Sequence, residues 1–281
     1  MREIEATKVA ETVARLCMEA NYDLGDDVLR AIRDGLKTEE SPAGQDILKQ
    51  LLENARIAAE ERVPMCQDTG LAVVFLELGQ DVHVVGGNLV DAVNEGVRRG
   101  YGEGYLRKSV VAHPIGDRRN TGDNTPAIIH TEIVPGDRMK ITIAPKGAGS
   151  ENMSGLKMFA PAVGVEGVKD FVVDWVEKAG SNPCPPIVVG VGVGGTMEVA
   201  ALIAKKALLR PIGQHSRFPD VAALEDELLE RINRLGIGPQ GLGGRVTALG
   251  VNVEVYPCHI ASLPVAVNIN CHASRHKEAV L

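Results

Sequence analysis

The segment that organises this chain is Val63-Pro64-Met65-Cys66-Gln67-Asp68-Thr69-Gly70, which places a thiol, an amide and a carboxylate on three consecutive residues. An amphipathic helix pattern that starts at Pro42 leads into it, and the apolar run 71–75 leads out of it. Pro64 prevents the helix from continuing, and Gly70 permits a sharp turn into a strand. The sequence therefore predicts a rigid helix-to-strand loop that presents Cys66, although a half-buried structural cysteine is the simpler alternative.

Composition limits the classes of protein to consider. A chain of 281 residues can bury a large core, and its apolar content of 44% and charged content of 24% are typical of soluble globular proteins. The net charge of −7 argues against binding to nucleic acid or to a membrane surface, although a local cluster of Arg and Lys can still gather an anionic substrate. The N-terminus lacks an apolar signal region, and no apolar run approaches the ~20 residues of a membrane span. We therefore predict a cytoplasmic protein without a nucleic-acid or membrane partner.

Hydrophobic periodicity predicts an α/β fold in which helices surround a mixed β-sheet core. Apolar residues recur at helical spacing through the N-terminal part, about residues 1–62, and strand and helix patterns alternate after it. No repeat or clear linker interrupts the chain, so residues 1–281 are predicted to form a single domain. The predicted helices cover residues 3–20, 26–36, 42–62, 89–99, 163–179, 197–209 and 220–235, and the predicted strands cover residues 71–78, 82–85, 130–134, 139–144, 187–195, 246–256 and 265–269.

Two glycine-rich stretches have alternative interpretations. Gly190, Gly192 and Gly195 form the G-x-G-x-x-G pattern after a strand and before a helix, as in dinucleotide sites. Such a site also needs an acidic residue ~20 positions later, whereas this chain has the basic, proline-broken run 209–212 in that region. Close packing of strand against helix is therefore the preferred explanation. The second stretch, Lys146–Asn152, is either an ordinary turn or a backbone concavity that binds an anion.

Residues 100–125 are rich in glycine and in charged side chains, among them Arg107. A loop of this length is usually functional or disordered. From the residues alone, the simplest interpretation of Arg107 is a solvated loop charge, and that of His259 is a hydrogen-bonded structural histidine. Cys258 and His259 could form a nucleophile–base pair, but adjacent residues rarely orient one another.

The five cysteines, an odd number without a tight pairing pattern, argue against a disulfide framework. Cys17 lies on the apolar face of the first predicted helix, and we interpret it as a core residue. Cys66, Cys184 and Cys271 stand instead in strand-end loops, far apart in the sequence and without the short C-x₂₋₄-C knuckles of structural zinc sites. A thiolate-bound iron–sulfur cluster assembled from distant loops is therefore one possibility.

Four segments of this chain, in this order, resemble the signature of the class I, iron–sulfur fumarate hydratase and tartrate dehydratase family. The likeness extends over nearly the whole chain. It is a likeness to the α subunit of a two-subunit enzyme, equivalent to the N-terminal part of single-chain relatives. The segments are V-P-M-C-Q-D-T-G at 63–70, K-G-A-G-S-E-N at 146–152, N-P-C-P-P with its Gly-rich strand from 182, and C-H-I-A-S-L-P-V from 258, which leads to Cys271.

The resemblance implies a cofactor. A 4Fe-4S cluster would be held by Cys66, Cys184 and Cys271, which leaves the fourth iron open to substrate. An open iron can act as a Lewis acid on a hydroxyl or carboxylate group. Two other classes stay open: a non-catalytic iron–sulfur or redox-sensing module, and a zinc-stabilised binding protein.

The resemblance also implies roles for side chains around the substrate. Gln67 and Asp68 would lie beside it, Arg107 would grip one of its carboxylates, and the backbone of Gly149 would face that carboxylate. Asp68 would pair with His259, and the two would handle the proton of the departing hydroxyl group.

The activity that the resemblance implies is that of a hydro-lyase acting on a small dicarboxylate. The first candidate is the reversible hydration of fumarate to (S)-malate, a reaction of the tricarboxylic acid cycle, and the alternative is L-tartrate dehydration. Single-chain relatives continue into a second domain that carries the catalytic base, whereas this chain stops at Leu281. We therefore expect a β subunit that carries the base, and homodimerisation of the α chain within a heterotetramer.

Overall fold

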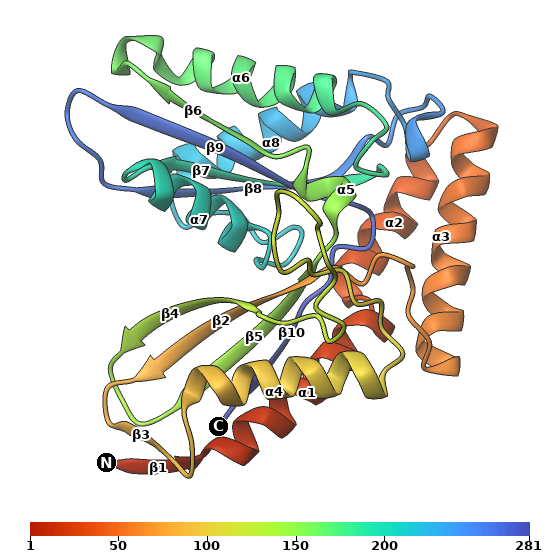
Figure 1. Cartoon of the computed structure of the whole chain (residues 1–281). Helices are drawn as coiled ribbons and strands as arrows, with labels where there is room; N and C mark the ends of the chain where they lie inside the picture. The colour runs from red at the N-terminus through yellow and green to blue at the C-terminus, as the bar shows by residue number, and fades with distance from the viewer. The chain divides into compact units, whose positions relative to one another are not determined.

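The computed structural model describes residues 1–281 and contains helices and mixed β-sheets, which confirms the predicted α/β class (Figure 1). The chain separates into two compact units, each made of segments that are distant in the sequence. Unit 1 comprises residues 1–24, 54–148 and 275–281, and unit 2 comprises residues 25–53 and 149–274. Compactness describes contacts and not independent folding, so a single folding domain over 1–281 stays a prediction.

Unit 1 is a four-stranded mixed sheet with two long helices. The strand order is β10-β5-β2-β4, and β2 runs parallel to β4 but antiparallel to β5. A short parallel ribbon of β1 and β3 accompanies it. The elements are β1 (Arg2–Glu5), α1 (Ala6–Tyr22), the end of α3 (Pro42–Glu61), β2 (Leu71–Gly79), β3 (Val82–Val85), α4 (Leu89–Glu103), β4 (Ile128–Val134), β5 (Met139–Lys146) and β10 (Lys277–Val280).

The core of unit 1 lies where α1 and α4 pack against alternate residues of β2. Val74 and Leu76 share one face of the strand and join Val13 of α1 and Val97 of α4 in one buried cluster. Gly96 lets α4 approach α1 closely, since a side chain at that position would collide with Val13. Burying each of these side chains contributes about 1.5–3 kcal/mol. This packing therefore fixes β2 and, with it, the loop that precedes it.

Cys17 belongs to this core and is fully buried. Burial raises the pKa of its thiol to about 12, so the group stays protonated near neutral pH and is a poor metal ligand. The prediction that Cys17 is a core residue is confirmed.

Unit 2 contains a second four-stranded sheet with the order β6-β9-β7-β8. The central strand β7 runs parallel to β8 and antiparallel to β9. The elements are α2 (Asp26–Thr38), the start of α3, most of α5 (Ala148–Glu151), β6 (Gly155–Phe159), η1 (Pro161–Val163), α6 (Gly164–Ala179), β7 (Ile187–Gly194), α7 (Met197–Ala207), α8 (Pro219–Asn233), η2 (Pro239–Gly241), β8 (Ala248–Tyr256) and β9 (Leu263–Asn270).

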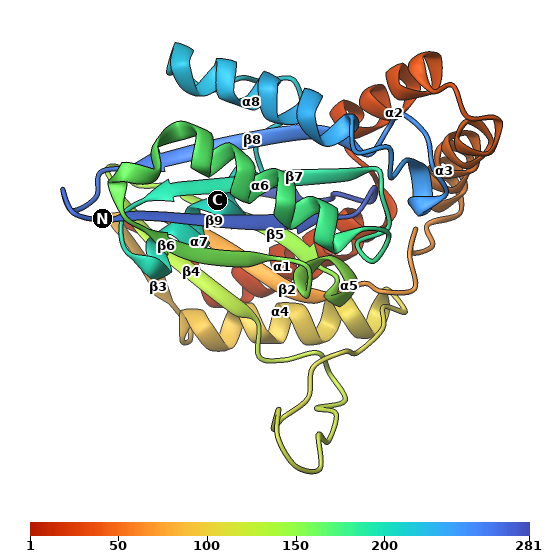
Figure 2. The same ribbon diagram turned by 90° about the horizontal axis from the view of Figure 1, so that it is seen from above.

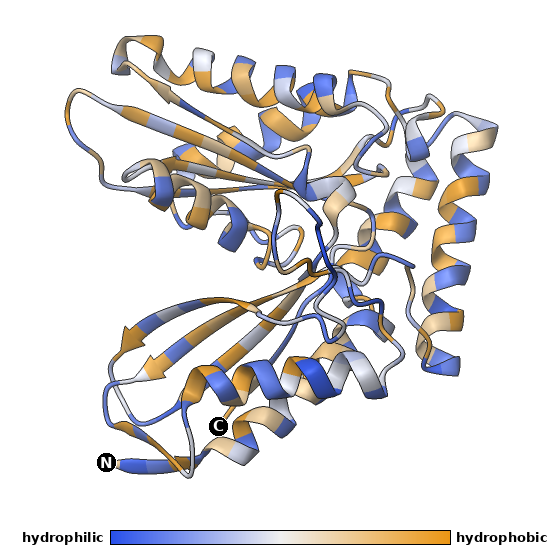
Figure 3. Ribbon diagram, viewed as in Figure 1, coloured by the Kyte–Doolittle hydropathy of each residue, from blue (hydrophilic) through white to orange (hydrophobic).

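The helices are amphipathic. Polar and apolar residues alternate around α3 and α6 (Figure 3), as expected when one side of a helix is buried and the other faces water. In α6 the buried side includes Val168, Val172 and Val176, spaced by one helical turn. No helix in the structure combines the length and the apolar character that a membrane span requires.

The glycines of the G-x-G-x-x-G pattern serve the packing of α7 on β7. A Cβ atom at Gly190 would stand 2.2 Å from the Ala204 carbonyl oxygen, and one at Gly192 would stand 2.1 Å from the Ala200 carbonyl oxygen. Neither distance leaves room for a side chain. The preferred interpretation, close packing of strand against helix, is confirmed.

The predicted elements differ from the structure mainly at three short strands. The periodicity predicts a helix from Glu3, whereas residues 2–5 form β1, and it predicts no strand where β6 and β10 lie. Each of these strands pairs with one neighbour that is remote in the sequence: β1 with β3, β6 with β9 and β10 with β5. Their extended form therefore depends on distant backbone partners and not on a local apolar pattern.

A buried carboxylate fixes the segment after α2. Glu39 is 3% exposed and accepts backbone N–H groups from Ser41, Arg245 and Val246 at 2.8–3.0 Å. Gly244 must be glycine here, because a Cβ atom would stand 2.5 Å from a Glu39 oxygen. Burial raises the pKa of Glu39, but these donors outweigh it and hold the pKa below its ordinary value of 4.5.

We expect Glu39→Gln to lower the free energy of unfolding by about 2 kcal/mol or more at neutral pH, because an amide offers one acceptor oxygen where the carboxylate offers two. The folded-state pKa of Glu39 is depressed, so its contribution is present above pH 4.5 and is lost as the pH falls through that pKa. Thermal unfolding of wild type and variant should therefore converge in acid. Glu40→Gln, whose side chain is exposed, is the matched control. An equal loss of stability in both variants would contradict the assignment.

Candidate functional site

Segment 63–70 is an irregular loop of unit 1 between α3 and β2, as predicted (Figure 1). Met65 anchors its start: the side chain is buried, the N–H donates to the Asn21 carbonyl at 3.0 Å, and the carbonyl accepts from the Asn54 side chain at 2.8 Å. Gly70 ends the loop at φ +71°, and a Cβ atom there would stand 2.5 Å from the backbone of Lys146. The intervening residues are thus held at both ends.

Asp68 is the most constrained side chain of this loop. Its carboxylate accepts the backbone N–H groups of Gly70 at 3.1 Å and of Ala148 at 2.8 Å. Its own N–H donates to the Cys66 sulfur at 3.4 Å, and the Gln67 side-chain oxygen lies 3.4 Å from the same sulfur. The thiol, the amide and the carboxylate therefore form one small group with a defined geometry.

Arg107 is brought to this group by Thr69. The Arg107 N–H donates to the Thr69 hydroxyl oxygen at 2.9 Å, and that hydroxyl donates to the Arg107 carbonyl at 3.2 Å. Thr69 is 1% exposed, and its carbonyl accepts the buried Tyr101 hydroxyl at 2.7 Å. The backbone of Arg107 is thus fixed beside the loop while its side chain remains exposed.

The structure adds Arg275 to this group, a residue that no motif in the sequence indicated. Arg275 is 4% exposed, and one of its guanidinium nitrogens donates to the Asp68 carbonyl at 2.6 Å. This charge-assisted bond joins the C-terminal segment of unit 1 to the loop. The only available signal was a basic residue four positions after Cys271, which is weak by itself.

In unit 2, the β7–β9 pairing places Cys184 and Cys271 at the same end of the sheet. Val188 pairs with Asn270 in antiparallel register, so the residues just before β7 and just after β9 are neighbours. The His272 N–H donates to the Cys184 carbonyl at 3.4 Å, and the His272 Nδ1 atom lies 3.0 Å from the same oxygen.

Gln240 holds the Cys184 loop from a second side. Its backbone N–H and its side-chain Nε2 both donate to the Pro185 carbonyl, at 2.7 and 2.9 Å. Gln240 adopts φ +54°, a conformation that non-glycine residues rarely take. No local sequence signal indicated this role, because Gln240 lies 55 residues from Pro185.

Gly149 lies in α5, next to the residue whose N–H binds Asp68. Gly149 is exposed, and a Cβ atom there would meet only the Asn182 carbonyl, at 3.5 Å. Glu151 fixes the segment within unit 2 through an ion pair with Lys205 at 2.5 Å and a bond from Asn268 at 3.1 Å. The segment is therefore a short helix fixed by the contacts of Glu151, and not an ordinary flexible turn.

His259 lies at the other end of the unit 2 sheet from Cys184 and Cys271. It stands on the exposed turn that joins β8 to β9 (Figure 1), where its Nδ1 accepts the Ala261 N–H at 3.1 Å. That turn adjoins the C-terminal end of β7, since Gly194 pairs with Tyr256. The eight residues of β7 separate its two ends by about 23 Å. His259 is therefore not a neighbour of these two cysteines within unit 2.

The five cysteines differ in their exposure to solvent. None of the five cysteines forms a disulfide, and Cys66, Cys184 and Cys271 are all at least partly exposed, unlike Cys17. Within neither unit do three His, Cys, Asp or Glu side chains gather closely enough to hold a metal ion. The neighbouring positions of Cys184 and Cys271, on loops held by backbone contacts and with thiols that form no disulfide, fit the ligation of an iron–sulfur cluster, which takes thiolates.

Comparison with known proteins agrees with these motifs. The family model described as fumarate hydratase (fumerase) matches residues 10–280. The chain belongs to the fumarate hydratase family. The match covers both compact units, so the whole fold and not one motif carries the relationship.

Three relatives of this chain are named as tartrate dehydratase α subunits. A Methanocaldococcus jannaschii protein named "Putative L(+)-tartrate dehydratase subunit alpha" is 46% identical over 275 residues, which is 95% of each chain. L(+)-tartrate dehydratase subunit alpha of Escherichia coli (strain UTI89) is 35% identical, and that of strain K12 is 33% identical; each covers 95% of this chain and 89% of its own length. Fumarate hydratases add water and tartrate dehydratases remove it, so the family is one of hydro-lyases.

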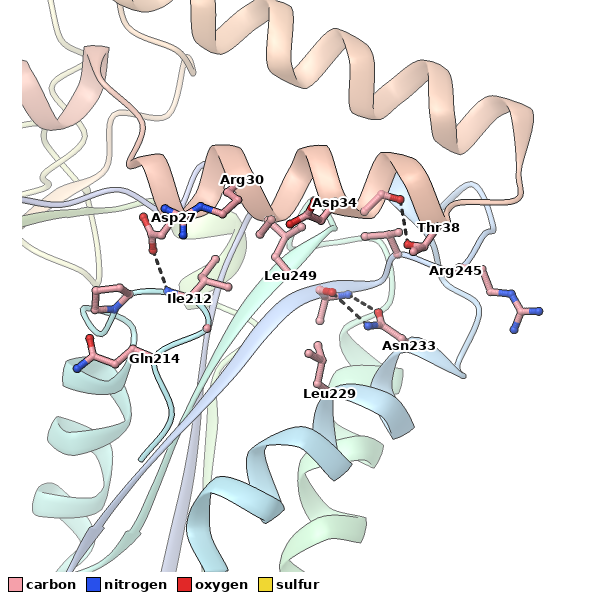
Figure 4. A pocket seen from close by; sticks show the side chains of 16 residues that line it. Asp27, Arg30, Asp34, Thr38, Ile212, Gln214, Leu229, Asn233, Arg245 and Leu249 are labelled. Carbon is pink, nitrogen blue, oxygen red and sulfur yellow. Dashed lines mark hydrogen bonds between the residues drawn. The ribbon is translucent and has the colours of Figure 1, made fainter. Parts of the chain in front are cut away.

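A separate groove of about 820 Å³ in unit 2 lies between α2, α8 and residues 211–214 and 245–249 (Figure 4). Two of its polar side chains make hydrogen bonds to the backbone: Asp27 accepts the Ile212 N–H at 2.8 Å, and Asn233 forms hydrogen bonds with the backbone of Thr247 and Ala248. No cysteine lines the groove. The groove therefore contributes no side chain to the candidate site of this fumarate hydratase family member.

Proposed function

We propose that this chain is the α subunit of a two-subunit hydro-lyase that dehydrates L(+)-tartrate. The names and the near-complete coverage of the relatives carry the proposal. From the sequence alone, fumarate hydration is the first candidate and tartrate dehydration the alternative, and the names of the relatives favour tartrate. Fumarate hydration stays the second candidate because of the description of the matching family.

The α chain and its β subunit, purified together without oxygen, should convert L(+)-tartrate to oxaloacetate. We expect kcat/KM for L(+)-tartrate to exceed that for (S)-malate or fumarate by about tenfold or more, which corresponds to a difference of 1.4 kcal/mol in the barrier. The isolated α chain should have little or no activity, because the catalytic base is assigned to the β subunit. A preference for malate and fumarate would establish the second candidate instead. Full turnover by the α chain alone would contradict the two-subunit enzyme.

The proposed cofactor is a 4Fe-4S cluster with Cys66, Cys184 and Cys271 as ligands. Support comes from three thiols that form no disulfide and stand on loops fixed by neighbouring backbone contacts. When bound, the cluster would supply an open iron that acts as a Lewis acid on the substrate hydroxyl group. Cys258 is exposed as well, but it stands at the His259 end of the unit 2 sheet and is not proposed as a ligand.

Serine variants separate these ligands from the other two cysteines. Cys66→Ser, Cys184→Ser and Cys271→Ser should each lose iron, acid-labile sulfide and the brown colour, because two thiolates do not replace three. Cys17→Ser and Cys258→Ser should retain them. The measurement is iron and sulfide per chain after anaerobic reconstitution, together with the visible spectrum. Full iron content in any of the first three variants would refute that residue as a ligand, and zinc without sulfide would favour the zinc-stabilised alternative.

The remaining residues would bind the substrate and move a proton. Arg107 offers a planar fork for one carboxylate, and the exposed backbone of Gly149 would face the same group. Gln67 would lie beside the substrate, next to Cys66. Asp68, oriented by its two backbone donors, would pair with His259, and the two would handle the proton of the departing hydroxyl group. The β subunit would remove the proton from the neighbouring carbon.

His259 would have to reach Asp68 from a second copy of this chain. Asp68 lies two residues from Cys66, and the proposed cluster joins Cys66 to Cys184 and Cys271. The His259 turn of the same chain is separated from those two cysteines by the length of β7. The expected homodimer of α chains supplies a second His259, so each active site would combine Asp68 of one copy with His259 of the other.

Mixing two inactive variants tests this arrangement. Asp68→Asn and His259→Asn should each lower the rate by ~10²–10⁴-fold, as for a lost proton-transfer group. When the two are coexpressed in equal amounts with the β subunit, random pairing in a two-fold dimer should restore about one quarter of the wild-type activity. Each mixed dimer then has one intact site and one site with both substitutions. No recovery in verified mixed dimers would show that His259 does not act across copies.

A further inference from the structure

Residues 108–121 form an arm that extends from unit 1 between α4 and β4 (Figure 2, yellow-green). The arm has a definite shape. Its tip is closed by the Arg118 side chain, which donates to the Pro114 carbonyl at 2.7 Å. Its two sides are joined by three backbone pairs: Val111 with Asn120, Ala112 with Arg119 at 2.8 Å, and Val110 with Thr121 at 3.0 Å.

This ordered arm buries almost nothing at its tip. All nine residues from Ala112 to Asn120 are exposed, and the Ile115 side chain is 77% exposed. Fixing a backbone in one conformation costs conformational entropy, which folded segments normally offset by burying apolar surface. The exposed arm buries too little apolar surface to offset this entropic cost by itself. Burial against a second surface would offset the cost and would explain the ordered shape of the arm.

The charge of the arm indicates what kind of surface that is. The arm, residues 108–121, has three basic side chains and one acidic side chain, Asp117, although the whole chain has a net charge of −7. An acidic partner surface complements this segment, whereas a second copy of the same arm would repel it. The three basic residues are Lys108, Arg118 and Arg119.

The root of the arm is bonded to the loop that holds Asp68. Asn124 is fully buried; its side-chain oxygen accepts the Ser109 N–H at 2.6 Å, and its side-chain nitrogen donates to the Gly70 carbonyl at 3.1 Å. The hydrogen bonds between Thr69 and Arg107 are a second attachment. A partner that covers the arm down to this root would therefore lie beside Gln67, Asp68 and Arg107.

We propose that the arm is the docking element for the β subunit, which meets it with an acidic surface and an apolar recess for Ile115. This inference rests on the proposed two-subunit enzyme and adds the surface through which the subunits join. A β subunit that covers the arm down to its root would place its base near the loop that holds Asp68.

The charge part is tested by the affinity of the α chain for the β subunit. The double variant Arg118→Glu/Arg119→Glu should weaken binding by about tenfold or more, and the wild-type affinity should fall with added salt. The control is Arg33→Glu/Lys37→Glu, which makes the same change in charge on the exposed side of α2. Equal affinities for the arm variant and wild type, or equal losses in the arm variant and the control, would overturn the proposal.

The apolar part is tested with a matched pair of exposed isoleucines. Ile115→Ser should weaken binding by roughly tenfold, as for an apolar anchor that enters a recess. Ile133→Ser on β4, where the side chain is 72% exposed, should change binding by less than about twofold. Both variants should keep the melting temperature and the iron content of the isolated α chain, which separates lost docking from lost folding.

These measurements also separate the arm from the proposed reaction. Arm-dependent binding by a complex that turns over neither tartrate nor fumarate would support the docking element and contradict the enzyme assignment. Tartrate turnover by a complex whose subunit affinity is unchanged by the arm substitutions would support the enzyme assignment and contradict the docking element. Failure of the wild-type α chain to bind the β subunit would overturn both.

Discussion

The two backbone hydrogen bonds to the Asp68 carboxylate are the constraint on which the candidate site in unit 1 depends. The bond from Gly70 closes the loop before β2, and the bond from Ala148 ties that loop to the segment after β5, at the end of the sheet where Leu71 pairs with Lys146. The glycine at position 70 is required because the backbone of Lys146 passes where a side chain would start. Thr69 then fixes the backbone of Arg107 from the same loop. A thiol, an amide, a carboxylate and a guanidinium-bearing residue are thereby held by backbone contacts and do not rely on the packing of their own side chains.

The corresponding constraint in unit 2 is the central strand β7. Its glycines allow α7 to lie directly on the sheet, and its antiparallel partner β9 brings Cys184 and Cys271 to one end. The same pairing sends His259 to the opposite end. One register therefore accounts both for two neighbouring thiols and for a histidine that, in the proposed active site, would act from a second copy of the chain. Homodimerisation would then be a requirement of the active site and not only of stability.

The parts of the fold that were predicted correctly have strong local signals. The stop at Pro64, the turn at Gly70 and the apolar runs of β2, β7 and β9 can be identified from consecutive residues, and the long helices follow from their 3.6-residue spacing. The strands β1, β6 and β10 were missed because backbone pairing with remote segments, and not side-chain pattern, makes them extended. Arg275 and Gln240 were missed for a similar reason: each acts on a carbonyl group that lies 207 or 55 residues away.

The sequence by itself determined which chemical groups this chain carries and the local frame of each, because glycine, proline and apolar periodicity act over a few residues. It also determined the family, since four motifs in order are matched by a family model over residues 10–280. Only the tertiary structure decided which of those groups are neighbours. The β7–β9 register grouped Cys184 with Cys271 and separated both from His259, and the bonds of Thr69 and Asn124 joined the arm to the Asp68 loop. Such juxtapositions arise from hydrogen bonds and packing between residues far apart in the chain, which no local pattern records.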